Sequence, residues 1–274
     1  MSARRHRQSE LAMALILSPP RNAFLSPRED PPLEGTTMWV IVAPRIRMAR
    51  VWAAEEVAQA ADYLSGVLLP YPRELQTPVR RYVEGILEWE ELVSRVRAMG
   101  LSYVDVWSWT EEPLLRRLKS LTAAGYKLKV ECYGPPLRED AEASWEVTRL
   151  LLRVRVTGKV DLEAWRRLIG GVKTPVREGY ATLSLKPAEG VKVSAWMYPM
   201  PPSDTLSAEN LSEESVRALA DYVFKYLVAT SNPDEAYVKW LSETHRELSE
   251  ELLPLARALG VLRREELEEG GTTG

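Results

Sequence analysis

The stretch LLPYPRELQTPVRRYVEGILEWEEL, Leu68 to Leu92, begins as an apolar strand, breaks at two prolines and continues into a basic, amphipathic helix. A strand, a break and a helix in this order are typical of a βαβ unit, in which ligands gather beyond the carboxyl end of the strand. Pro70 and Pro72 withhold two backbone donors, so the strand must end there. We therefore expect Arg73 and Glu74 to lie at the carboxyl edge of a parallel sheet.

Apolar runs of strand length alternate with helical patterns over the first two thirds of the chain. The predicted strands are MWVIVAP (38–44), GVLLPYP (66–72), YVDVWSW (103–109) and YKLKVECYG (126–134). The predicted helices cover 51–63, 78–84, 88–99, 110–125 and 140–155, with Thr110 as the N-cap of the fourth. This alternation predicts an α/β fold with a mostly parallel sheet covered by helices.

The last third of the chain has a different pattern. The run GYATLSLKPAEGVKVSAWMYP (179–199) predicts a β-hairpin that turns at Pro187 to Gly190. Ser212 in SEES, and Asn232 or Ser231 in SNPDEA, predict the N-caps of two closing helices. The chain therefore divides into an N-terminal arm or first strand (1–37), an α/β core (38–172), a C-terminal β-hairpin with helices of the same globule (173–266), and a disordered tail (267–274).

The ionisable and sulfur-containing residues argue against several classes of function. The chain has 274 residues and a formal net charge of −3, so no basic field indicates a nucleic-acid partner. Cys132 is the single cysteine, which excludes an internal disulfide and argues against a thiolate metal cluster. The two histidines, His6 and His245, lie near opposite ends of the chain, which argues against a histidine triad or a polyhistidine metal site.

Hydropathy and composition bear on the cellular location of the protein and on the growth temperature of its source. No apolar run approaches the roughly 20 residues that span a bilayer, so we expect no membrane association and a cytoplasmic protein. The N-terminal run MSARRHRQSELAMALILSPP is basic and then apolar, like a signal peptide, but Glu10 adjoins the apolar part and no small-residue cleavage site follows. We interpret it as a first strand or a basic tail. Scarce asparagine and glutamine, with abundant arginine, glutamate and proline, fit a protein from a thermophile.

Several motifs between Val67 and Gly134 occur together in a known family. They are the strand GVLL, its exit PYPRELQ, the segment RRYVEGI, the acidic helix EWEELVSRV and the run PLLRRLKSLTAAGYKLKVECYG. In these motifs the chain resembles the ChaN-like proteins of the EreA/TraB superfamily, which include haem-binding lipoproteins and proposed hydrolases. The resemblance implies an α/β fold for this part of the chain.

The catalytic signature of that family is missing from this sequence. Its active members have Gly-Glu-x-His after the first strand and a glutamate at the end of the second. Here VAPRIRMAR follows the first strand, with Pro44 and Arg45 where the acid and the imidazole belong, and the second strand ends at Leu69 and Pro70. The resemblance therefore implies a catalytically degenerate domain that binds a ligand or a partner protein. No ligand set supports a divalent metal or haem, so the cofactor stays unidentified.

Arginine and aromatic residues gather near the predicted strand ends. Guanidinium groups bind phosphate and carboxylate in bidentate fashion, and aromatic rings stack on flat ligands. The candidate ligand-binding residues are Arg45, Arg47, Tyr71, Arg73, Trp109 and Tyr133. If the first two predicted strands are neighbours, these residues line one crevice for an anionic small molecule or an acidic segment of a partner protein. The alternative interpretation is that the arginines pair with nearby glutamates and the aromatic rings pack in the core.

Carboxylates in and near the predicted strands suggest a second function. Asp105 and Glu131 interrupt apolar strands, and Glu74 follows the second strand. Together they are weak candidates for a rearranged site of a metal-dependent hydrolase, since Mg²⁺ needs only oxygen ligands. The alternative is that Asp105 and Glu131 point to a sheet edge or bond arginines of adjoining helices.

A second amphipathic region follows the predicted core strands. The run TRLLLRVRVTGKVDLEAWRRL places Arg149, Arg153 and Arg155 among apolar residues. Such a helix usually buries one face and extends its arginines to solvent. The alternative is a helix that binds a partner protein, with Trp165 as its anchor.

Overall fold

A computed structural model describes residues 38–169, 173–188, 191, 195–196 and 199–262. The predicted N-terminal arm and acidic tail lie outside these residues. The strands are β1 Trp39–Val42, β2 Gly66–Pro72, β3 Lys129–Gly134, β4 Tyr180–Ser184 and β5 Ala195–Trp196. The helices are α2 Arg47–Ala60, α3 Gln76–Val83, α4 Trp89–Ala98, α5 Val104–Ala123, α6 Leu137–Thr157, α7 Leu162–Ile169, α8 Pro202–Thr205, α9 Glu213–Tyr222, α10 Pro233–Thr244 and α11 Arg246–Ala258, with short turns η1 Ala61–Tyr63, η2 Arg73–Leu75 and η3 Val223–Leu227.

The strands form a single parallel sheet in the order β3-β2-β4-β1-β5. β1 pairs with β4 from Trp39 opposite Ala181 onward, and β2 pairs with β4 from Gly66 opposite Tyr180 onward. The sheet confirms the predicted α/β class. It also shows that β1 and β2 are not neighbours, because β4 lies between them.

The main core fills the space between one face of the sheet and the helices that follow β1 and β2. Ile41, Leu69 and Leu183 point to this side and pack with residues of α2, α3, α4 and α5. Helices α10 and α11 extend the same core with Tyr237 and Leu252. Burying one apolar stripe of each helix against the sheet is the usual source of stability in this class of fold.

The opposite face of the sheet carries a smaller cluster. Val40 and Val42 are fully buried there and pack with Ala188 and Met200. The segment before β4 crosses the same face, where the Thr182 hydroxyl donates to the Pro175 carbonyl over 3.0 Å. Polar side chains on this face are therefore paired with the chain that covers them.

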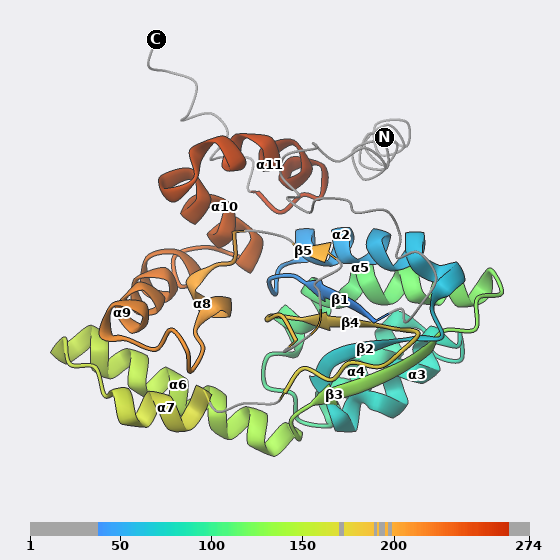
Figure 1. Cartoon of the computed structure of the whole chain (residues 1–274), viewed down its shortest axis with the longest axis horizontal. Coiled ribbons are helices and arrows are strands. Elements are labelled where there is room, and N and C mark those ends of the chain that lie inside the picture. Colours follow the sequence, from blue (N-terminus) through green and yellow to red (C-terminus); the bar gives the residue numbers. More distant parts are fainter. Residues whose placement is uncertain (1–37, 170–172, 189–190, 192–194, 197–198, 263–274) are drawn as a thin grey trace, which may run out of the picture.

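A group of helices lies apart from the sheet. Figure 1 shows α6 and α7 below α8 and α9, to the left of the sheet and of α3 and α4. Leu150, Leu151, Trp165 and Leu219 make a separate small core between α6, α7 and α9. We call this group the helical lobe. Trp165 is 2% exposed, which contradicts the alternative interpretation in which it anchors a partner protein.

The run 103–109, predicted to be a strand, is helical in the structure. It forms the first part of α5, which places Asp105 and Thr110 inside a helix and corrects both assignments. Its aromatic and β-branched residues favoured a strand locally, but buried residues recur three and four positions apart at Val104, Trp107 and Glu111 and beyond. The helical period continues without a break, so the packing against α2 decides the local structure.

The predicted hairpin at 179–199 is also corrected. β4 pairs with β1 and β2, and β5 pairs with the other side of β1, all in parallel. A strand pair separated by β1 cannot be a hairpin. The helix starts predicted for this region are confirmed: the Ser212 hydroxyl accepts from the Ser215 N–H, and the Asn232 side chain accepts from the Glu235 N–H.

Candidate functional site

Arg45 follows β1 at the carboxyl edge of the sheet and is held by an acid of the helical lobe. Its backbone N–H donates to Asp204 Oδ2 over 2.9 Å, and its Nε and Nη2 each lie 3.3 Å from Asp204 Oδ1. The Asp204 side chain is 3% exposed, whereas that of Arg45 is 60% exposed. The negative charge of Asp204 raises the pKa of Arg45. A buried carboxylate therefore orients a guanidinium group that still faces solvent.

Arg50 lies beneath this position, in a buried network at the exit of β1. Its Nε donates to Glu111 Oε2 over 2.6 Å, and its Nη1 donates to the Pro44 carbonyl over 3.0 Å. The Tyr71 hydroxyl donates to the same Glu111 oxygen over 2.7 Å. Since all three side chains are buried, the network joins α2, β2 and α5 and offers no surface to a ligand.

The electrostatics of this network keep Arg50 and Tyr71 in the protonation states that their hydrogen bonds require. Burial by itself lowers the pKa of Arg50, but the charge and hydrogen bond of Glu111 outweigh it and the pKa is raised. Burial raises the pKa of Tyr71 well above its ordinary value, and the charge of Glu111 adds to this effect. Arg50 is thus charged and the Tyr71 phenol keeps its proton.

Arg47 serves a structural role at the start of α2. Pro113 has no N–H, so the Trp109 carbonyl one turn earlier in α5 lacks its helical donor. Arg47 Nη1 donates to that carbonyl over 2.5 Å and to Glu112 Oε2 over 2.9 Å. Its guanidinium group lies 4.4 Å from the centre of the Trp109 ring. The pairing of Arg47 and Trp109 explains how α5 accommodates a proline in its interior.

The first turn of α2 is capped by a residue far away in the sequence. Ile46 stands at the N-cap and has no acceptor, and Asp234 of α10 takes its place. The Arg47 and Met48 N–H groups donate to the Asp234 oxygens over 2.9 and 2.8 Å. Burial raises the pKa of Asp234, while these two N–H groups oppose the increase. Asp234 therefore fixes α10 to the exit of β1.

The exit of β2 is arranged differently. Arg73 begins η2 with an exposed side chain, and no hydrogen bond or ion pair joins it to another residue in the described part of the chain. The Glu74 carboxylate accepts from the Leu137 N–H at the start of α6 over 3.1 to 3.2 Å. Because β4 separates β1 from β2, the exits that carry Arg45 and Arg73 are about 10 Å apart on average strand spacing.

The remaining aromatic candidate, Tyr133, is used within the protein. Its hydroxyl donates to the Leu183 carbonyl over 2.7 Å. Burial raises the pKa of Tyr133 to about 12. Tyr71 is 2% exposed and its ring meets Trp107 edge-on at 5.6 Å. Both aromatic residues therefore support the sheet from within.

The three candidate carboxylates have separate partners. Asp105 is 86% exposed on α5 and accepts from Arg97 over 2.5 Å. Glu131 accepts from Arg177 over 2.7 Å and from the Tyr180 hydroxyl over 3.3 Å. Glu74 caps α6 as described above. Within the described residues there is no group of three histidine, cysteine or acidic side chains that could hold a metal ion.

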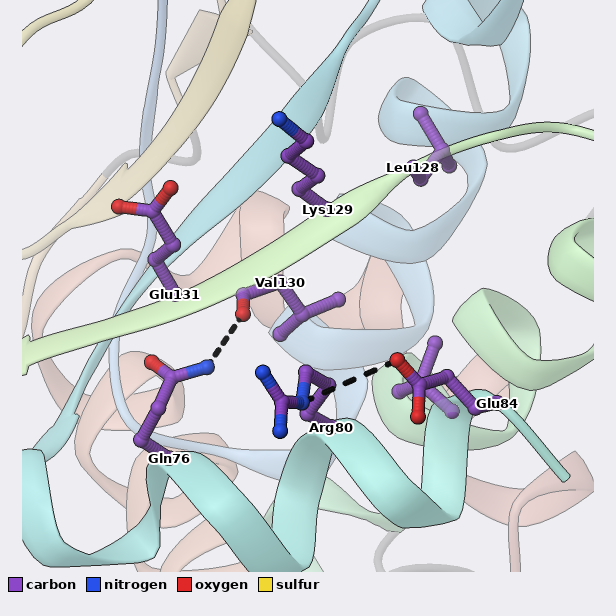
Figure 2. Close-up of a pocket in the computed structure, with 8 residues that line it drawn as sticks. Gln76, Arg80, Glu84, Leu128, Lys129, Val130 and Glu131 are labelled. Atoms are coloured by element: carbon purple, nitrogen blue, oxygen red, sulfur yellow. Dashed lines mark hydrogen bonds and ion pairs between the residues drawn. The ribbon is translucent and has the colours of Figure 1, made fainter. Parts of the chain in front are cut away.

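A groove of about 330 Å³ runs beside the outer edge of β3. Figure 2 shows Gln76 reaching from α3 to this edge, while Lys129 and Glu131 extend from the strand away from α3. Gln76 Nε2 donates to the Val130 carbonyl, and the Cys132 N–H donates to Gln76 Oε1, each over 2.6 Å. The side chain thus pairs with the edge as another strand would, which protects it from a foreign strand. Glu131 alone among the predicted site residues lines this groove.

The sequence identified Arg45 and Arg73 as candidates but did not reveal the acids that hold the exit of β1 together. Glu111, Asp204 and Asp234 come from three segments that are distant in the sequence. A usable signal was present for Arg50, whose neighbours Met48, Ala49, Val51 and Trp52 predict a buried position.

None of the helices in the described ranges is both long enough and apolar enough to cross a membrane. Comparison with protein-family models, with curated proteins and with solved structures found no match for this chain.

Proposed function

We propose that this chain is a non-catalytic domain that binds an anionic group, a carboxylate or a phosphate, at the carboxyl edge of its sheet. The observation that carries the proposal is Arg45, whose guanidinium group is fixed by buried Asp204 and remains 60% exposed. Two of its five N–H donors point to Asp204, which leaves three for a ligand. An arginine that is already oriented loses little conformational entropy when it binds.

Arg73 is the second contact of this proposal. It follows β2 at the same edge, it is exposed, and it has no hydrogen bond or ion pair with the residues described. A ligand that spans about 10 Å, such as a molecule with two acidic groups or an acidic protein segment, reaches both arginines. The likeness to ChaN-like proteins and the loss of their Glu and His residues fit such a role, and membership in that group is part of the proposal.

Metal-dependent hydrolysis at Glu74, Asp105 and Glu131 has less in its favour. The first caps a helix, the second is on the surface of α5, and the third pairs with Arg177. Asp105 no longer belongs to a strand beside Glu131, which removes the geometric reason for grouping them.

Binding experiments with probes of defined charge test the proposal. Calorimetry measures the affinities of inorganic phosphate, a tricarboxylate and a glutamate-rich peptide. We expect the longer probes to bind most tightly, because they can reach both arginines. Arg73→Ala should weaken the best of these about tenfold, because a charge-assisted hydrogen bond contributes roughly 1.5–3 kcal/mol. Arg45→Lys keeps a charge beside Asp204 but loses the planar fork, and should weaken binding by a similar factor.

Arg246→Ala is the matched control, since Arg246 on α11 is 84% exposed and lies outside the proposed site. Equal affinities for Arg73→Ala, Arg45→Lys and Arg246→Ala would reject the proposed contacts. Absence of binding by all three probes at about 10 mM would reject the anionic ligand class. Binding of the peptide alone would assign the site to a partner protein.

A further inference from the structure

Helix α6 carries a line of exposed apolar side chains. Trp145 is 72% exposed, Leu152 49% and Val156 80%. They are spaced seven and four residues apart, which places them on one face of the helix. The opposite face holds Leu150, Leu151 and Val154, which pack in the small core of the helical lobe. The helix therefore has two apolar faces, and one of them meets solvent.

This exposure is concentrated rather than scattered. Val156 and Trp145 are the two most exposed large hydrophobic side chains in the described part of the chain. Figure 1 shows α6 and α7 along the lower border of the helical lobe. Single exposed hydrophobic residues are common, whereas several on one face of a helix indicate an interaction surface.

The charges of α6 indicate what covers this line. Residues 137–147 contain the four acids Glu139, Asp140, Glu142 and Glu146 and one arginine, a net charge of −3. Residues 148–157 contain Arg149, Arg153 and Arg155 and no acid, a net charge of +3. A helix dipole favours such charges only in the first and last turns. Here negative charge fills the first half of the helix and positive charge fills the second half. The first half of one copy is therefore complementary in charge to the second half of another copy.

We propose that a second copy of this chain packs on α6 in antiparallel orientation. An antiparallel pair places the acidic half of each helix over the basic half of the other, whereas a parallel pair opposes like charges. When the pair is centred between residues 148 and 149, Trp145 faces Leu152, and Glu142 lies on the same flank as Arg153 of the second copy. The same patch serves both copies, as a two-fold symmetric dimer requires.

The size of this contact sets the expected affinity. A helix of 21 residues is about 31 Å long, and a single helix pair is at the small end of specific interfaces. We therefore expect dissociation constants of roughly 1–100 µM. This interface is separate from the anionic site proposed above, so either can fail without the other.

Sedimentation velocity of the full chain from about 1 µM to about 500 µM tests the dimer. We expect a monomer–dimer equilibrium that Trp145→Ala weakens at least tenfold. Tyr63→Ala is the control, because Tyr63 is an aromatic residue that is 62% exposed on another part of the molecule, and it should leave the equilibrium unchanged. Melting temperatures of both variants verify folding.

Charge exchange tests the orientation. Glu142→Lys and Arg153→Glu should each weaken the dimer, and the double variant should restore it, since the two positions lie side by side only in the antiparallel pair. A monomer at every concentration overturns the proposal, as does a dimer that Trp145→Ala leaves intact. A double variant weaker than both single variants also overturns it.

Discussion

The exits of β1 and β2 both carry arginine, yet the two arrangements differ in what their arginines can do. At β1 each arginine meets an acid: Arg45 meets Asp204, Arg47 meets Glu112 and Arg50 meets Glu111. At β2, Arg73 is exposed and has no such partner among the described residues. Side-chain type alone therefore does not define a binding site. The acids that the fold brings to each position decide it.

The helices packed beside each exit explain the difference. β1 and β2 are both inner strands, but α5, α8 and α10 each send an acid toward the exit of β1. The exit of β2 passes directly into η2 and α3, and its one acid, Glu74, is used at the start of α6. Most of the charge at β1 therefore holds elements together, and the charge at β2 is available for binding.

The sharpest test of this contrast is removal of Arg50, which should cause the largest loss of stability. Arg50→Ala leaves Glu111 buried without its cation, and breaking a buried pair in this way costs roughly 3–5 kcal/mol of unfolding free energy. Urea denaturation measures the loss. The double variant Arg50→Met, Glu111→Leu should recover part of it, because no buried charge then lacks a partner. A loss below about 1 kcal/mol for Arg50→Ala would show that β1 and β2 do not differ as we describe.

Removal of Asp234 should have the next largest effect. Asp234→Ala leaves the Arg47 and Met48 N–H groups without acceptors at a buried helix start, and loss of such a cap costs roughly 1–2 kcal/mol. The control is Asp105→Ala, since Asp105 is an 86% exposed carboxylate whose loss should be within about 0.5 kcal/mol. Equal unfolding free energies for the two variants would contradict the capping role.

Alkaline pH should weaken the network at β1 through Tyr71. The folded state raises the pKa of Tyr71 well above 10.0, whereas the unfolded state keeps the ordinary value. The stabilisation is complete below pH 10, and it is lost as the pH rises further because the unfolded chain releases the proton first. One such group changes stability by up to roughly 1.4 kcal/mol per pH unit. Urea midpoints at pH 8 to 11 should fall less steeply in Tyr71→Phe than in the unaltered protein. Identical slopes would mean that the phenol is not held as described.

Much of the fold could be predicted from the sequence because β1, β2 and β3 are short apolar runs between helical patterns. The prediction of a strand at 103–109 was wrong. The aromatic and β-branched residues of this segment favour a strand locally, but its buried residues recur with the helical spacing of α5. The prediction of a hairpin was wrong because a turn between two apolar runs indicates two strands but not which strands pair. Here β1 lies between β4 and β5. The site was predicted in part: the arginines are visible in the sequence, but the partners Asp204 and Asp234 are more than 150 residues away from them.

The smallest effect on stability is expected for Arg73. Arg73→Ala removes an exposed side chain with no ion pair to a described residue, so the unfolding free energy should change by less than about 0.5 kcal/mol. The same variant should lose about tenfold in affinity for the best anionic probe, because its charge is available only to a ligand. The two exits thus respond differently: Arg50→Ala at β1 mainly lowers the unfolding free energy, and Arg73→Ala at β2 mainly weakens binding. Denaturation and calorimetry on the same Arg73→Ala sample make the comparison direct. A loss of stability above about 2 kcal/mol would mean that Arg73 holds the fold together as the arginines of β1 do, and the contrast between the two exits would then be wrong.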